Sequence, residues 1–141
     1  MRAVLDPNVL ISALLSPKGA PARILLAWRA GAFEMVVSEA LIDETRRALD
    51  YPRLRRLVPA AAASSYVAMI LESAVLGADP HPYPLMVRSR DPDDDYLLAL
   101  AADAGALLVT GDGDLLELAG EVPIHTPASF LGLIPDGAGD S

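Results

Sequence analysis

Four acidic residues, far apart along this 141-residue chain, have the side-chain type and placement to do chemistry together. They are Asp6, Glu44, Asp94 and Asp112. Two carboxylates at ~4 Å repel each other by roughly 4 kcal/mol at an effective dielectric constant near 20. A cluster of carboxylates is therefore stable only if it takes up protons or if a divalent cation neutralises it. The chain has no cysteine, and an all-oxygen ligand set favours Mg²⁺ or Mn²⁺ over zinc.

The elements that must position these acids follow from the apolar pattern. Short apolar segments predict strands at residues 3–5, 33–37, 106–109 and 122–125. Helices are expected at residues 8–15, 21–30, 38–50, 59–75, 91–104 and 115–119, and after Thr126-Pro127. The proline-rich residues 77–90 predict an extended loop or a short edge strand. Because the strands lack polar alternation, we expect an α/β fold: a three-layer α/β/α sandwich with a mainly parallel central sheet.

This topology predicts that the four acids share one cleft. Chemistry in such sheets gathers at the carboxyl ends of the strands, near the switch in strand order. Asp6 closes the first strand, and Asp112 follows the strand at 106–109. Glu44 lies on the flank of the buried face of its helix, and Asp94 shares a helical face with apolar residues three, four and seven positions later. Each acid, taken alone, is also compatible with a turn, a helix start or the solvated surface.

Length and composition indicate a single domain. We expect a domain over residues 1–134 and a flexible tail over 135–141. An apolar content of 52% excludes a disordered chain. No apolar run approaches the ~18–20 residues of a membrane helix, and no secretory signal pattern is present. We therefore expect a cytoplasmic protein that does not associate with membranes.

The formal net charge of −8 is distributed unevenly. All eleven Lys and Arg residues lie within positions 1–90, and the rest of the chain carries only acidic charges. The local field rather than the average decides whether a protein binds nucleic acid. Candidate contacts to an RNA backbone are the arginines in and after the helix that holds Glu44, which are Arg46, Arg47, Arg53, Arg55 and Arg56. The alternatives for this cluster are a solvated helix face and a surface for an acidic partner segment.

Taken together, these residues resemble the PIN domain (PilT N-terminus) family, in particular the toxin-type PIN endoribonucleases. The resemblance covers nearly the whole chain, from Val4 to about Leu133. Its specificity comes from the order and separation of several motifs. These are Val4-Leu5-Asp6-Pro7-Asn8-Val9-Leu10, Glu44, Asp91-Pro92-Asp93-Asp94-Asp95 and Val109-Thr110-Gly111-Asp112-Gly113-Asp114-Leu115.

The resemblance implies a role for each matching residue. Asp6, Glu44, Asp94 and Asp112 resemble the acidic metal-binding and catalytic quartet of the family. Asn8 and Thr110 resemble its supporting polar positions, Asp114 resembles an auxiliary acid, and Asp95 is an alternative to Asp94. Pro7 is a departure, because the family often has Thr or Ser at this position.

The same resemblance implies an activity and partners. We expect a Mg²⁺- or Mn²⁺-dependent endoribonuclease that hydrolyses RNA phosphodiesters with an activated water. We also expect a cognate antitoxin protein, as in a type II toxin–antitoxin pair, and a homodimer. The alternative is a catalytically weak PIN scaffold that binds RNA or protein.

A third class, a phosphoryl-transfer or receiver-type domain with Asp6 as nucleophile, lacks its usual features. No Asp-x-Asp follows the first strand, no lysine lies beyond Lys18, and no glycine-rich loop ends in Gly-Lys-Ser/Thr.

Overall fold

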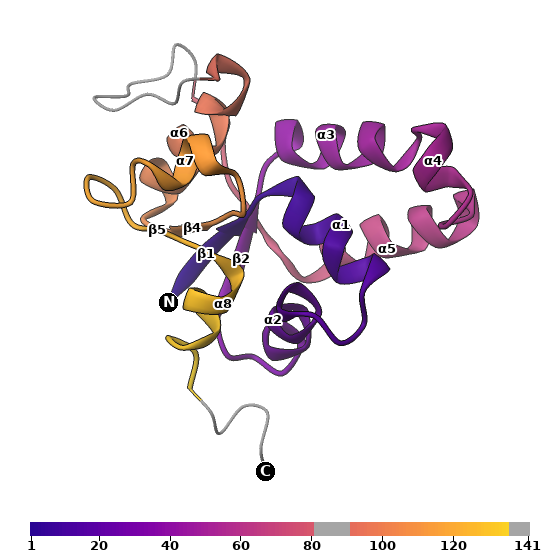
Figure 1. The fold of residues 1–141 in the computed structure, drawn as a ribbon, viewed down its shortest axis with the longest axis horizontal. Helices are drawn as coiled ribbons and strands as arrows, with labels where there is room; N and C mark the ends of the chain where they lie inside the picture. The colour runs from indigo at the N-terminus through magenta and orange to yellow at the C-terminus, as the bar shows by residue number, and fades with distance from the viewer. Residues whose placement is uncertain (81–90, 136–141) are drawn as a thin grey trace.

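The computed structural model describes residues 1–80 and 91–135. Within these residues, five parallel strands form one sheet in the order β3-β2-β1-β4-β5 (Figure 1). The strands are β1 (Arg2–Leu5), β2 (Glu34–Val37), β3 (Val75–Leu76), β4 (Leu107–Val109) and β5 (Ile124–His125). The chain runs outward from β1 to β3 on one side and then continues with β4 on the other side. The switch in strand order therefore falls between β1 and β4.

Helices cover both faces of this sheet, which confirms the expected α/β/α sandwich. They are α1 (Pro7–Leu15), α2 (Ala20–Arg29), α3 (Glu39–Leu49), α4 (Pro52–Arg55), α5 (Ala60–Ser73), the 3₁₀ turn η1 (Pro92–Asp94), α6 (Asp95–Ala104), α7 (Gly113–Leu116) and α8 (Pro127–Leu131). Helix α6 packs against β1, β2 and β4, whereas α1 packs against α2 and α3, and α2 packs against α8 (Figure 1). Within the described residues, no single helix is long and apolar enough to cross a membrane; only α1 and α2 taken as one pair, bent by 97°, reach that length and composition.

Local capping explains where several helices begin and end. The Ser38 hydroxyl accepts a hydrogen bond from the Leu41 amide at 3.3 Å, and the Thr126 hydroxyl accepts one from the Ser129 amide at 3.1 Å. Gly105 ends α6 with a φ of +62°, a left-handed conformation that glycine adopts without strain. These helix boundaries agree with those expected from the sequence.

The core is apolar on both faces of the sheet. The rings of Phe33 and Phe130 meet edge to face with centroids 5.1 Å apart, so α8 packs against the residue that precedes β2. The buried Tyr66 of α5 donates a hydrogen bond to the Leu10 carbonyl at 2.6 Å. Inward-facing polar groups in this core are therefore paired, as the low internal dielectric requires.

The structure corrects the expected boundary between the fifth helix and the strand that follows it. Helix α5 ends at Ser73, and Val75–Leu76 form the edge strand β3 beside β2. The apolar pattern of the sequence predicts a helix to residue 75 and an extended loop or short edge strand only within 77–90. Pairing with β2 explains the difference, since the Gly77 amide also donates to the Val37 carbonyl at 2.7 Å. Residues 81–90 and most of the expected tail, 136–141, lie outside the described residues.

Two shorter elements also differ from the expectation. Pro52 ends the preceding helical run, as expected, but it also starts the one-turn helix α4, where its fixed φ suits the first helical position. The expected helix at 91–104 begins as the 3₁₀ turn η1 and becomes α-helical at Asp95.

Candidate metal-binding active site

Asp6 is fixed at the carboxyl end of β1, next to the switch in strand order. Its backbone amide donates to the Val109 carbonyl of β4 at 2.9 Å. Its carboxylate caps α1 by accepting from the Asn8 amide at 3.0 Å, and it accepts from the Thr110 hydroxyl at 2.8 Å. Pro7 takes the first position of α1, where a backbone N–H would have no helical partner. The departure from the family at Pro7 therefore removes no hydrogen bond from the helix.

Thr110 links Asp6 to the loop that carries Asp112. The fully buried Thr110 hydroxyl accepts from the Asp112 amide at 3.0 Å while it donates to Asp6. The Asp112 carboxylate in turn accepts from the Asp114 amide at 3.0 Å and caps α7. These hydrogen bonds run from Asp6 through Thr110 to Asp112 and its neighbour Asp114. They fix the positions of Asp6 and Asp112 at the ends of β1 and β4.

Glu44 reaches the site from α3 and is held there by Tyr96 of α6. The buried Tyr96 hydroxyl donates a hydrogen bond to the Glu44 carboxylate. Burial, this hydrogen bond and the negative charges of Glu44, Asp6 and Asp94 all raise the pKa of Tyr96. The phenol therefore stays protonated and acts as a donor to Glu44.

Asp94 carries the clearest electrostatic effect of the site. Its pKa is raised to about 7, first by burial, then by a hydrogen bond with Asp112, and then by the negative charges of Asp112, Asp91 and Asp6. The pKa of Asp6 is also raised by burial and by the charges of Glu44 and Asp112, although its hydrogen bonds with Asn8 and Thr110 act in the opposite direction. In both groups burial is the largest cause of the raised pKa, and the charges of neighbouring carboxylates add to it.

The fold thus brings the four acids singled out from the sequence into electrostatic contact with one another. Of the residues expected as supporting, Thr110 contributes its side-chain hydroxyl to the hydrogen bonds around Asp6 and Asp112, whereas Asn8 and Asp114 contribute their backbone amides. Asp94 lines the cleft and lies close enough to Asp112 and Asp6 for their charges to raise its pKa, whereas Asp95 does not line the cleft. Of the two alternatives, the geometry favours Asp94.

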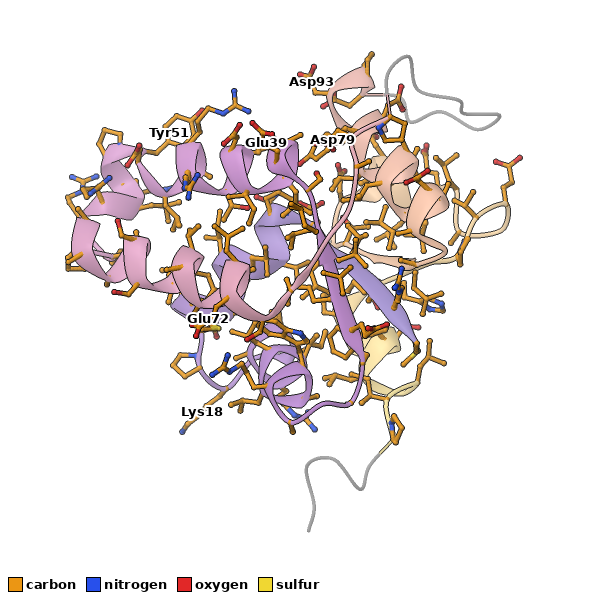
Figure 2. All side chains as sticks on the ribbon, turned by 180° about the vertical axis from the view of Figure 1, so that it is seen from behind. Lys18, Glu39, Tyr51, Glu72, Asp79 and Asp93 are labelled. Atoms are coloured by element: carbon orange, nitrogen blue, oxygen red, sulfur yellow. The ribbon has the colours of Figure 1, made fainter. Side chains whose placement is uncertain are left out.

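Three of the four acids, Asp6, Glu44 and Asp94, line a cleft of about 980 Å³ between α3 and η1, whereas Asp112 is not among its lining residues. Its lining is rich in charged groups, and comprises Asp6, Pro7, Asn8, Ala40, Asp43, Glu44, Arg46, Arg47, Ala48, Asp50, Tyr51, Asp93, Asp94 and Tyr96. Figure 2 shows Tyr51, Glu39 and Asp93 along one rim of the molecule, on the side opposite Lys18 and Glu72. The cleft therefore extends from the acids along α3 to its carboxyl-terminal end.

Only part of the expected arginine cluster lies in this cleft. Arg46 and Arg47 line it, whereas Arg53, Arg55 and Arg56 of the α4 segment do not. Arg55 forms an ion pair with Asp50, and Arg46 lies 3.9 Å from Asp43. The phosphate-binding hypothesis therefore concentrates on the two arginines of α3.

Two tyrosines of the cleft were not assigned to the site from the sequence. The contact of Tyr96 with Glu44 joins residues that are 52 positions apart, so no local pattern indicates it. Tyr51 had a detectable pattern, because it lies seven positions after Glu44, two helical turns along the same face.

The donor chemistry of the site fits a hard divalent cation. Carboxylate oxygens are the ligands that Mg²⁺ and Mn²⁺ prefer, and raised carboxyl pKa values indicate negative charge that a cation would neutralise. Within residues 1–80 and 91–135, no three Asp, Glu or His side chains already stand at ligand spacing. Side-chain rotation is therefore needed for the acids to close on an ion.

Comparison with known proteins identifies the class. The PIN domain family model matches residues 2–114, so the chain belongs to the PIN domain family. PIN domains are generally nucleases that use divalent metal ions. An uncharacterized protein of Methanocaldococcus jannaschii, MJ1680, is 29% identical over 148 residues, which cover 93% of this chain and 90% of that relative.

Solved structures share the fold. PAE2754 from Pyrobaculum aerophilum matches with a TM-score of 0.63 and 22% identity, covering 94% of this chain and 88% of that one. VapBC2 from Rickettsia felis, bound to a DNA fragment from its promoter, matches at 0.59 and 12% identity over 89% of this chain and 97% of that one. FitAcB from Neisseria gonorrhoeae matches with a TM-score of 0.59 and 17% identity, covering 89% of this chain and 98% of that one. The likeness confirms the PIN-like α/β/α architecture.

Proposed function

We propose that this protein is a Mg²⁺- or Mn²⁺-dependent endoribonuclease that hydrolyses RNA phosphodiesters. The observation that carries the proposal is the gathering of Asp6, Glu44 and Asp94 along one cleft, with Asp112 held beside Asp6 by the shared Thr110 hydroxyl. Acids that repel one another at the carboxyl ends of parallel strands destabilise the fold unless protons or a cation neutralise them. A divalent cation in this place agrees with membership of the PIN domain family.

In this proposal Asp6, Glu44, Asp94 and Asp112 hold one or two divalent cations. A cation bound there supplies Lewis-acid activation of water and stabilises charge on the leaving 3′ oxygen. Asp112 or Asp114 orients the attacking water, and Thr110 keeps Asp6 and Asp112 in place through its hydroxyl. Arg46 and Arg47 bind the phosphates that flank the cleaved bond.

We further propose that the protein is the toxin of a type II toxin–antitoxin pair, acting on cytoplasmic RNA as a homodimer. The support is the fold shared with VapBC2 and FitAcB. A small gene immediately upstream would encode the antitoxin. Co-expression of its product with a tagged form of this chain is expected to give a complex that does not cleave RNA. If the two proteins do not bind each other, this assignment is wrong while the nuclease proposal stands.

The nuclease proposal is tested with purified protein and labelled cellular RNA. Cleavage is expected with Mg²⁺ or Mn²⁺ and not with EDTA, and Asp6→Asn, which preserves the shape of the side chain and its capping oxygen, is expected to abolish it. Cleavage that continues without metal and survives Asp6→Asn would exclude the mechanism. RNA binding without cleavage in Mn²⁺ would instead favour the catalytically weak binding module.

A further inference from the structure

Tyr51 is an exposed aromatic residue inside a cleft that is otherwise mainly charged. The residue is 66% exposed and lies at the end of the cleft that is remote from Asp93 (Figure 2). Among the residues that line this cleft, Tyr51 and Tyr96 are the aromatic ones, and Tyr96 is buried with its hydroxyl on Glu44. An exposed ring in a candidate nucleic-acid cleft offers a face on which a base can stack.

The position of Tyr51 relative to the acids follows from helix geometry. Arg47, Ala48 and Tyr51 come three, four and seven positions after Glu44, so they continue along the face of α3 that carries Glu44. Although α3 ends at Leu49, the next residue keeps helical dihedral angles, and the Tyr51 amide donates to the Ala48 carbonyl at 3.2 Å. Seven residues correspond to about 10 Å along a helix axis. Tyr51 is therefore too far from the acids to contact the cleaved phosphate itself.

The backbone holds Tyr51 in a defined place. Pro52 restricts Tyr51 to an extended conformation, with φ −59° and ψ 139°, and makes it the residue that precedes α4. The Tyr51 carbonyl accepts from the Arg55 amide at 2.8 Å, and the Arg55 side chain pairs with Asp50. An aromatic ring on a fixed backbone loses little conformational entropy when a base stacks on it.

The positively charged side chain of Arg47 comes between Tyr51 and Glu44 along α3, where it can bind the adjoining phosphate. Arg47 lines the cleft and forms no ion pair within residues 1–80 and 91–135, whereas Arg46 and Arg55 are each close to an aspartate. Of the arginines on this face, Arg47 is the one whose guanidinium has no acidic partner to give up on binding a phosphate.

We propose that Tyr51 stacks on the base of a nucleotide that flanks the cleaved bond, with Arg47 on the phosphate between them. This inference rests on the proposed nuclease function. Bases in a duplex are stacked on one another and offer no free face to a protein ring, so an unstacked base requires an unpaired strand. The separation along α3 assigns Tyr51 to a flanking nucleotide.

Binding measurements test this proposal with matched variants. The probe is a fluorescein-labelled single-stranded RNA taken from a segment that the wild-type protein cleaves, and anisotropy is measured with Mn²⁺ in an Asp6→Asn background. Adding Tyr51→Ala is expected to weaken binding by about 5- to 100-fold. Tyr51→Phe keeps the ring, so its RNA affinity is expected to stay within about twofold of the parent. The same is expected of Leu57→Ala, because Leu57 is also 66% exposed but lies outside the cleft. Unchanged binding with Tyr51→Ala would overturn the proposal.

A second measurement identifies the contacted base. Each base of the probe is replaced in turn by an abasic site, and one flanking position is expected to weaken binding to the Asp6→Asn parent but not to Asp6→Asn/Tyr51→Ala. A duplex of the same sequence is expected to bind both proteins equally. If an abasic site weakens binding equally at every position and in both proteins, the stacking proposal is overturned. Cleavage of RNA by the wild-type protein would still support the nuclease proposal in that case. A wild-type protein that cleaves no RNA would overturn both.

Discussion

The hydroxyl of Tyr96 on α6 donates a hydrogen bond to the carboxylate of Glu44 on α3, and this contact joins the two helices beside the cleft. Glu44 lies within α3, away from the strand ends that hold Asp6 and Asp112. Its position therefore depends on a residue of another element. Tyr96 acts as a positioning residue for a proposed metal ligand.

Replacing Tyr96 with Phe is expected to weaken Mn²⁺ binding by about tenfold or more, because partners that orient metal ligands affect affinity on that scale. The measurement is a titration of free Mn²⁺ by electron paramagnetic resonance. Tyr66→Phe is the control: Tyr66 is also buried and hydrogen-bonded, but to the Leu10 carbonyl in the core. It is expected to lower stability and leave Mn²⁺ affinity unchanged. Equal affinity in wild type and Tyr96→Phe would contradict this role.

Thr110→Val removes the hydroxyl that serves both Asp6 and the Asp112 amide. The shape of the side chain is retained, so the expected loss of about 1–3 kcal/mol in the free energy of unfolding comes from unpaired buried polar groups. RNA cleavage is expected to fall as well, because Asp6 and Asp112 lose their common partner. Thr110→Ser, which keeps the hydroxyl, is expected to restore most of both properties. Stability is measured by urea unfolding and activity by the rate of RNA cleavage. If Thr110→Val and Thr110→Ser do not differ in either, the Thr110 hydroxyl does not hold Asp6 and Asp112 together.

The raised pKa of Asp94 predicts how stability depends on pH. A carboxyl group whose pKa is higher in the folded state stabilises the fold when protonated, and this contribution is lost as the pH rises through the folded pKa. Without metal, stability from this group is therefore expected to decline between about pH 4 and pH 7. Asp6, whose pKa is also raised, acts in the same direction. Thermal unfolding with EDTA, measured across this range, gives the test.

Metal binding is expected to reverse that trend, since Mn²⁺ favours the ionised carboxylates and binds only the folded site. Melting temperatures with Mn²⁺ should therefore rise towards neutral pH. In Asp94→Asn the decline seen with EDTA should become shallower. Identical pH dependences of stability for wild type and Asp94→Asn in EDTA would show that ionisation of Asp94 does not destabilise the fold.

Gly77 provides a prediction about the fold alone. A Cβ atom at this position would lie 2.8 Å from the Leu100 side chain and 3.1 Å from the Val36 side chain. Both neighbours are fully buried, so Gly77→Ala is expected to lower the free energy of unfolding by about 1–3 kcal/mol. Gly120→Ala is the control, because nothing lies within 4 Å of its added Cβ. Equal stability of the two variants in urea would contradict the close packing of Gly77 against Leu100 of α6 and Val36 of β2.

Much of the fold could be predicted because its determinants are local. Asp6-Pro7 ends a strand and starts a helix, Ser38 and Thr126 cap helices through their own hydroxyls, and Gly105 ends α6. Helical spacing also indicated that Glu44 faces inward from α3. In each case the deciding interaction involves residues only a few positions apart, so the pattern is visible in the sequence.

The rest depends on contacts between distant segments. Val75 and Leu76 pair with β2 in a strand of two residues, which the sequence does not distinguish from the last turn of an apolar helix. The Tyr96–Glu44 hydrogen bond requires α6 and α3 to be placed before it can be recognised. Sequence patterns identified which residues carry charge, but not which of them share a hydrogen bond.

Anomalous scattering from crystals soaked in Mn²⁺ tests the central claim most directly. We expect one or two Mn²⁺ peaks among the carboxylates of Asp6, Glu44, Asp94 and Asp112, and we expect Asp6→Asn crystals soaked in the same way to lose or weaken them. An Mn²⁺-soaked wild-type crystal with no peak among these carboxylates, or with peaks only elsewhere on the molecule, would contradict the account.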